Sequence, residues 1–186
     1  MNDLLELIRQ RRSTRDFSDR PVNEDDLFRI FEAARWAPSS YNGQSWRFIY
    51  ADKNRDTEFY NILFDLLVPF NQAWAKAAPV LVLTMARIEY EHSGEEYKHS
   101  WYDLGLAVGN MIIMAESIGI STHQMAGIDF DRARNELNIP GKFEPVSMIA
   151  IGYAEKTGNL PLDIYKMESV SKERKELNEI VFSSKF

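Results

Sequence analysis

The sequence has no cysteine, and its only histidines, His92, His99 and His123, are far apart along 186 residues. Without cysteine the chain cannot form a disulfide, a thiolate nucleophile or a cysteine-ligated zinc or iron–sulfur site. The scattered histidines argue against a histidine-rich metal site. We therefore expect no resident metal, and any chemistry must come from other groups.

Positive charge is also in short supply, because 22 lysines and arginines face 28 acidic residues, giving a net charge of −6. This balance argues against a nucleic-acid-binding protein, since such domains usually carry a basic face. The familiar motifs GxSxG, HExxH, GxxxxGK(S/T) and GxGxxG are absent as well. Their absence removes the usual signals of serine hydrolysis, zinc proteolysis, ATP use and Rossmann-type dinucleotide binding.

Membrane and export signals are missing. The charged residues of the N-terminus follow its short apolar stretch instead of preceding it, which is not the order of a signal peptide. The most apolar run, residues 104–118, is shorter than the ~20 residues that span a bilayer, so it predicts a buried helix. By default we expect a cytoplasmic protein with no membrane contact.

The remaining composition is that of a globular chain, with 45% hydrophobic and 27% charged residues. No repeat or long linker divides it, so we expect one domain over residues 1–186. Helices and strands mix without strict alternation, which predicts an α+β fold. Apolar periodicity, caps and prolines predict helices at 4–8, 24–34, 58–68, 71–78, 103–117 and 129–137, and strands at 46–51, 80–85, 120–125 and 145–153.

Two segments lie outside this core pattern. Residues 89–99 are a charged loop that we interpret as a candidate lid. The tail from residue 160 shows no core of its own, yet residues 180–182 are apolar and β-prone, which would be unfavourable if left exposed. We therefore expect the tail, about residues 160–186, to pack on a partner.

Two polar clusters are candidate binding segments. Residues 11–15, RRSTR, place three guanidinium groups and two hydroxyls within five positions, which suits a phosphomonoester. Residues 38–44, PSSYNGQ, are rich in donors that suit the edge of a planar heterocycle. Taken alone, each cluster is better explained by ordinary structure, a solvated basic turn in the first case and a helix-to-strand connection in the second.

Taken together and in order, these segments resemble the nitroreductase family of FMN-dependent enzymes. RRSTRDF and APSSYNGQSWRF are followed by NQAWAKAAPVLV, DLGLAVGNMIIMAESIGI, IAIGY and KERKELNEIV, so the resemblance covers nearly the whole chain. It implies a central, mostly antiparallel sheet flanked by helices. It also implies an intertwined homodimer, with residues 103–120 as a central helix at the interface and a C-terminal extension exchanged between subunits.

The resemblance also implies a set of flavin contacts. Arg11, Ser13 and Arg15 would hold the phosphate, the ribityl chain and the pyrimidine edge, with Arg12 at an adjacent position. The loop implied to come from the other subunit contributes Pro38, Ser39, Ser40 and Asn42, with Gln44 at a matching family position. The remaining implied contacts are Asn71, the backbone of Gln124, Met125, Ala126 and Gly127, and the phosphate-clamping Lys172 and Arg174.

By this resemblance NAD(P)H would reduce FMN and leave, and a nitroaromatic, quinone or similar acceptor would then bind the same face, a ping-pong scheme. No catalytic side chain is implied, because the reactive atom belongs to the cofactor. Ser45 and Ala126 depart from the family's frequent proline and glutamate at these positions. The alternatives are dehalogenation, enone reduction or flavin fragmentation on the same fold, a non-catalytic flavin-binding protein, or an acidic domain without cofactor.

Overall fold

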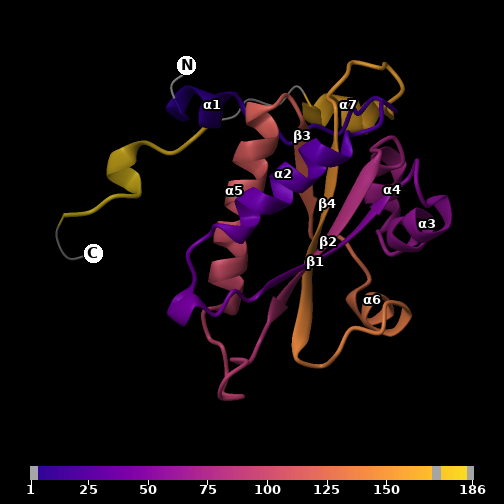
Figure 1. The fold of residues 1–186 in the computed structure, drawn as a ribbon. Coiled ribbons are helices and arrows are strands. Elements are labelled where there is room, and N and C mark those ends of the chain that lie inside the picture. The colour runs from indigo at the N-terminus through magenta and orange to yellow at the C-terminus, as the bar shows by residue number, and fades with distance from the viewer. Residues whose placement is uncertain (1–3, 169–172, 184–186) are drawn as a thin grey trace.

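The structure, a computed structural model, describes residues 4–168 and 173–183. Helices and strands are mixed along the chain without strict alternation (Figure 1). The strands are β1 (Trp46–Asp52), β2 (Val80–Arg87), β3 (Ser121–Met125) and β4 (Phe143–Gly152). The helices are α1 (Leu4–Gln10), α2 (Glu24–Arg35), α3 (Thr57–Asp65), α4 (Pro69–Ala75), α5 (Ser100–Ser117), α6 (Phe130–Glu136) and α7 (Leu162–Glu168), with short 3₁₀ turns at Ser40–Asn42 and Leu177–Glu179.

The strands form one sheet in the order β1-β2-β4-β3, and every neighbouring pair is antiparallel. β2 and β4 lie in the centre, so β1 and β3 are the two edges. The register of β2 against β4 shifts between Thr84 and Met85, where Val146 of β4 is passed over. The α+β class and the antiparallel sheet expected from the sequence are confirmed.

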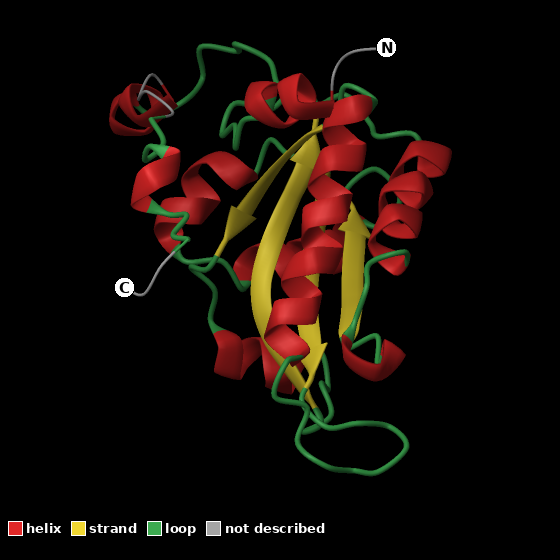
Figure 2. Ribbon diagram, turned by 90° about the vertical axis from the view of Figure 1, so that its left-hand side faces the viewer, coloured by secondary structure: helices red, strands yellow, loops and turns green. Residues whose placement is uncertain are grey.

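Helices cover both faces of the sheet, as Figures 1 and 2 show. Successive side chains of a strand point to opposite faces, so Val80 and Val82 meet α2 and α5. Leu81 and Leu83 point the other way, into a core that α3, α4, α6 and α7 close. All eight residues of β2 are buried, which explains its almost continuous apolar sequence.

Most helix boundaries agree with the expected caps, but those around Pro69 do not. α3 ends at Asp65 and α4 begins at Pro69, whereas the sequence predicts helices at 58–68 and 71–78. Proline tolerates the first helical position and forces the preceding residue into an extended conformation. Leu67 therefore forms an isolated bridge with Ile128, just beyond β3.

α5 is the long central helix that its apolar sequence predicts, and it crosses one face of the sheet (Figure 2). Its outer side stays open, because a Cβ added at Gly105 or Gly109 meets no atom within 4 Å. Trp101 and Tyr102 are exposed at its start. No helix in the described ranges has the length and apolar character needed to cross a membrane.

The tail divides into two parts. Ile164 of α7 is 1% exposed and belongs to the core beneath the sheet, whereas Leu162 and Tyr165 of the same helix are exposed. Beyond the gap the chain runs away from the body (Figure 1). There Leu177–Glu179 form a 3₁₀ turn, and the β-prone residues 180–182 that follow are not part of a strand.

The segment 89–99, interpreted from the sequence as a charged loop and candidate lid, forms a short hairpin that one isolated bridge closes. Glu89 and Glu96 form an antiparallel bridge, and Tyr90 N donates to the carbonyl oxygen of Glu95 at 2.8 Å. The charges that suggested a loop lie on the exposed side of this hairpin, and its buried anchor is Tyr97.

Candidate functional site

The arginine-rich segment 11–15 links α1 to Phe17, which bridges to Ala154. Arg11 Nη1 donates to the hydroxyl oxygen of Ser13 at 3.1 Å. Arg12 and Ser13 are exposed, whereas Arg11 is half-buried. The segment thus offers guanidinium and hydroxyl groups at the surface while its end is fixed in the core.

Arg15 is held more tightly than the other arginines of the segment. Its backbone N–H donates to Glu168 Oε1 at 3.0 Å, and its Nη1 lies 3.4 Å from the same oxygen. Its guanidinium carbon lies 5.9 Å from the ring centre of Trp74. Arg15 Nε is buried and has no hydrogen-bond partner among the described residues. A buried donor without a partner costs free energy, which marks this guanidinium as suited to a further polar group.

His123 ties this segment to β3. Its Nδ1 lies 2.8 Å from the carbonyl oxygen of Thr14, so Nδ1 carries the proton and donates. The imidazole packs 4.5 Å from Trp74 between ring centres. Burial lowers the pKa of His123 to about 4, and the nearby charge of Arg15 acts in the same direction. At neutral pH the histidine is therefore an uncharged support for the arginine segment.

A second junction brings the end of β3 to the start of α4. Val68 N and Asn71 Nδ2 both donate to the carbonyl oxygen of Gly127, at 3.1 and 3.0 Å. A Cβ on Gly127 would lie 2.7 Å from Asn71 Nδ2, so this close approach requires glycine. The side chain of Met125 is buried in the core, which leaves only its backbone for a ligand, whereas Gln124 and Ala126 are exposed.

A cavity of about 730 Å³ lies beside this segment but has the wrong charge for a phosphate. Its carboxylates outnumber its cations by four to two. Like charges repel an anion, so the single chain favours phosphate at the arginine segment itself rather than in this cavity. The charged side chains that line the cavity are Asp16, Glu116, Glu155, Glu168, Arg12 and Lys156.

The polar loop 38–44 lies at the other end of α5. Ser40 N donates to Asp103 Oδ2 at 2.9 Å, near the start of α5. Arg12 lines a cavity with Glu116, near the end of that helix. A helix rises 1.5 Å per residue, so Asp103 and Glu116 are about 20 Å apart along α5. The loop residues placed there are Pro38, Ser39, Ser40, Asn42 and Gln44, of which Pro38, Asn42 and Gln44 are exposed.

The fold therefore brings three predicted segments together. Arg11 to Arg15, Asn71 and the end of β3 meet through Trp74 and His123. The loop 38–44 does not join them. Arg174 is exposed on the tail, where its Nη1 donates to the carbonyl oxygen of Glu173 at 2.9 Å. Lys172 lies outside the described residues.

Three residues of this site were not anticipated from the sequence. Trp74 follows Asn71 by one helical turn, so helical spacing could have placed it on the same side of α4. His123 and Glu168 gave no comparable signal, because their partners, Thr14 and Arg15, are more than 100 residues away.

Comparison with known proteins supplies a context for this arrangement. The chain matches the model of the nitroreductase family over residues 8–153. It is 27% identical over 180 residues to an FMN reductase (NAD(P)H) from Bacillus subtilis, an alignment that covers 87% of this chain and 70% of that protein.

Two solved structures extend the comparison. An oxidoreductase containing FMN is 34% identical, with a TM-score of 0.90 and coverage of 97% of this chain and 91% of the other. An FMN- and NADPH-dependent nitroreductase from a Sphingopyxis strain shares the fold at 21% identity, with a TM-score of 0.75 and coverage of 99% and 100%. With the family match spanning most of its length, this chain belongs to the nitroreductase family.

Proposed function

We propose that this chain is an FMN-dependent NAD(P)H oxidoreductase that passes reducing equivalents to a small acceptor such as a nitroaromatic or a quinone. The observation that carries the proposal is the packing of the arginine segment against α4 and β3 through Trp74 and His123. When bound, FMN supplies the hydride-accepting ring, and the protein supplies binding, orientation and electrostatics. This division of roles suits a chain without cysteine whose His123 is buried and neutral.

The residues present fit a ligand that carries one phosphate. Arg11 and Ser13 are already hydrogen-bonded to each other, which orients the guanidinium before an anion arrives. Arg15 Nε is a buried donor without a partner among the described residues, and a guanidinium presents its donors as a planar fork. We assign Arg11, Ser13 and Arg15 to the cofactor and Arg12 to its rim. Lys172 and Arg174 would close the phosphate site from the C-terminal segment.

The segment Gln124 to Gly127 would present its backbone to the ring. Two donors hold the carbonyl oxygen of Gly127, so the peptide units around Ala126 and Gly127 have a defined orientation. Asn71 supplies one of these donors and is itself buried. We assign Asn71 both to this support and to the rim of the flavin site.

A second copy of the chain would complete the site with its loop 38–44. In one chain that loop lies too far along α5 to reach the arginine segment. Large apolar side chains are exposed over α1, the start of α5 and the tail, a pattern that marks interaction surfaces. We propose a homodimer with two sites, each combining one chain's arginine segment with the partner's loop. The exposed apolar residues at these surfaces are Leu4, Leu5, Ile8, Trp101, Tyr102, Leu177, Ile180, Val181 and Phe182.

The decisive first experiment is to purify the protein, record its visible spectrum and add NADH or NADPH without oxygen. A yellow protein that bleaches supports the proposal. A colourless protein whose melting temperature does not rise with added FMN contradicts it, because a ligand of the native state must stabilise that state. Initial rates with a quinone acceptor should give parallel double-reciprocal lines if donor and acceptor use one site in turn.

Site assignment is tested by Arg11→Ala combined with Ser13→Ala. Loss of charge-assisted contacts to a phosphate should weaken FMN binding by about tenfold or more. Arg29→Ala is the matched control, because Arg29 is an exposed arginine of α2 that pairs with Asp26 at 3.3 Å. Equal FMN affinity of the double variant and the control would reject the phosphate assignment.

The shared site is tested by mixing two defective chains. One chain carries Arg11→Ala and Ser13→Ala, and the other, differently tagged, carries Ser39→Ala and Asn42→Ala. If each site uses one arginine segment and the partner's loop, the mixed dimer contains one intact site and recovers about half of the bound FMN. If both segments serve the same chain's site, the mixed dimer recovers none.

A further inference from the structure

The loop 38–44 has a conformation that its own sequence does not favour. Tyr41, Asn42 and Gln44 have φ values of 51°, 54° and 46°, in the left-handed region that non-glycine residues rarely adopt. Three such residues within four positions persist only where surrounding structure imposes them. Something outside the loop must therefore hold it.

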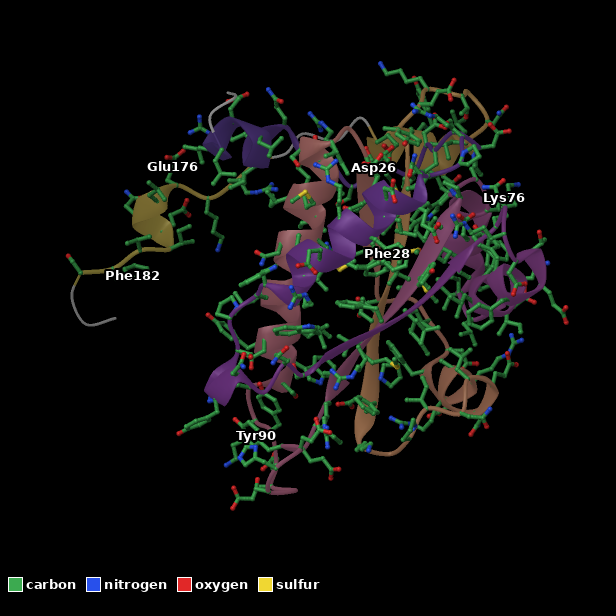
Figure 3. All side chains as sticks on the ribbon, in the orientation of Figure 1. Asp26, Phe28, Lys76, Tyr90, Glu176 and Phe182 are labelled. Atoms are coloured by element: carbon green, nitrogen blue, oxygen red, sulfur yellow. The ribbon has the colours of Figure 1, made fainter. Side chains whose placement is uncertain are left out.

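The hairpin that follows β2 provides that hold. Tyr97 is buried, and its ring stacks on Tyr90 with 4.0 Å between centres. The hydroxyl of Tyr97 donates to Asp103 Oδ2 at 2.6 Å, and that of Tyr90 lies 3.1 Å from Ser40 Oγ. Figure 3 shows Tyr90 at the end of the molecule opposite α1, where this hairpin leaves the sheet.

Asp103 joins the hairpin to the loop. Its Oδ2 accepts from Tyr97 and from Ser40 N, the latter at 2.9 Å, while its side chain is buried in the first turn of α5. A carboxylate with two donors at a helix N-terminus is well compensated for its burial. The Tyr97 hydroxyl also lies 3.2 Å from the carbonyl oxygen of Ser40, so both backbone polar groups of Ser40 face the same pair.

Two further contacts close the arrangement. A Cβ on Gly43 would lie 2.5 Å from the Tyr97 hydroxyl oxygen, so glycine is what allows the tyrosine to approach. Ser45 is fully buried and donates to the carbonyl oxygen of Ser100 at 2.8 Å. Ser45 therefore ties the far end of the loop to α5 through a bond that proline could not make.

We propose that Tyr97 and Asp103 are positioning residues, which hold the loop 38–44 in its strained form so that it fits over the flavin of a second copy. This inference rests on the proposed function. In this proposal the hairpin 89–99 is a fixed support that holds the loop in its binding conformation before a cofactor binds. Neither residue touches the cofactor; both act through Ser40 and Gly43.

The test compares Tyr97→Phe with Tyr60→Phe. The first variant removes the hydroxyl that contacts Asp103 Oδ2 and the carbonyl oxygen of Ser40, and it keeps the stacked ring. The second is a matched control, because Tyr60 is equally buried and its hydroxyl donates to the carbonyl oxygen of Ala78 at 2.7 Å, away from the loop. We expect both to lower the melting temperature, and only Tyr97→Phe to weaken FMN binding, by about tenfold.

Hydrogen exchange in the protein freed of FMN gives a readout that does not depend on the cofactor. Tyr97→Phe should speed exchange of the amides of residues 40–44 by about tenfold relative to Tyr60→Phe. Unchanged exchange would overturn the hold on the loop even if the wild type binds no FMN. Faster exchange with unchanged FMN affinity would overturn its role toward the flavin.

Comparing Asp103→Asn with Asp103→Leu separates the hydrogen bonds of Asp103 from its volume. Asparagine keeps one oxygen acceptor in nearly the same place, so it should retain most of the FMN affinity, whereas leucine should lose it. Equal FMN affinity and equal exchange in the two variants would show that the volume of Asp103, rather than its hydrogen bonds, matters, and would reject the proposal.

Discussion

The side-chain amide of Asn71 donates to the carbonyl oxygen of Gly127 at 3.0 Å and thereby joins the start of α4 to the end of β3. The same oxygen accepts from Val68 N at 3.1 Å, so one carbonyl receives two donors. The junction exists because Pro69, the first residue of α4, keeps Val68 extended, and Leu67 beside it bridges to Ile128. A proline visible in the sequence thus builds a feature of the site.

Gly127→Ala should damage this junction. Its Cβ would lie 2.7 Å from both Asn71 Nδ2 and Val68 Cγ2, so α4 must shift or the hydrogen bond must break. We expect the free energy of unfolding to fall by about 1–3 kcal/mol, measured by urea titration, with weaker FMN binding. Gly141→Ala is the control, because a Cβ there meets nothing within 4 Å. Equal stability of the two variants would contradict the tight packing at Gly127.

The burial of His123 predicts a loss of stability in mild acid. The unfolded imidazole takes up a proton near pH 6.5, whereas the folded one does so at a pKa of about 4. Between these values the unfolded state binds more protons, so the free energy of unfolding falls as the pH decreases. The full effect corresponds to roughly 3 kcal/mol.

Urea titrations between pH 7 and pH 4 measure this effect. In His123→Gln the free energy of unfolding should fall less steeply over that pH window than in the wild type. His92→Gln, at an exposed hairpin position, should leave the wild-type slope unchanged. Identical slopes for wild type and His123→Gln would mean that His123 is not buried in its neutral form.

Glu168 should matter more than an ordinary surface carboxylate. It accepts from the backbone and the guanidinium of Arg15 with only 25% of its side chain exposed. Glu168→Ala leaves these donors without an acceptor, so the free energy of unfolding should fall by about 1–3 kcal/mol. Glu136→Ala, which removes a more exposed pair with Arg132, should cost about 1 kcal/mol or less. Similar losses in the two titrations would show that Glu168 does not secure Arg15.

The open side of α5 predicts the outcome of Gly105→Glu. Nothing lies within 4 Å of a Cβ at this position, so the single chain should accept the side chain. If the proposed homodimer uses this face of α5, a charge placed there should prevent association. We expect a folded monomer by light scattering and loss of FMN, while Gly141→Glu stays dimeric. A dimeric Gly105→Glu would place the interface elsewhere.

Local patterns were enough to predict much of the framework. Asn23 and Asp129 cap α2 and α6 as expected, because capping depends on residues within one helical turn. The apolar run at residues 80–85 predicts a strand buried on both faces, and the structure has one at Val80–Arg87. The predicted helix bounds beside Pro69 were wrong, because a proline can follow one helix or begin the next. Nothing in the sequence indicated that Ile164 of α7 would be buried in the core.

The sequence by itself determined the class of fold, the family resemblance and the two polar segments, because composition, periodicity and motif order are properties of neighbours along the chain. Only the tertiary structure decided that His123 supports Thr14, that Glu168 holds Arg15 and that Tyr97 with Asp103 holds Ser40. It also decided that the segments 11–15 and 38–44 lie at opposite ends of α5. These relationships join residues that are distant in sequence, and packing around the sheet, rather than local propensity, sets their separation.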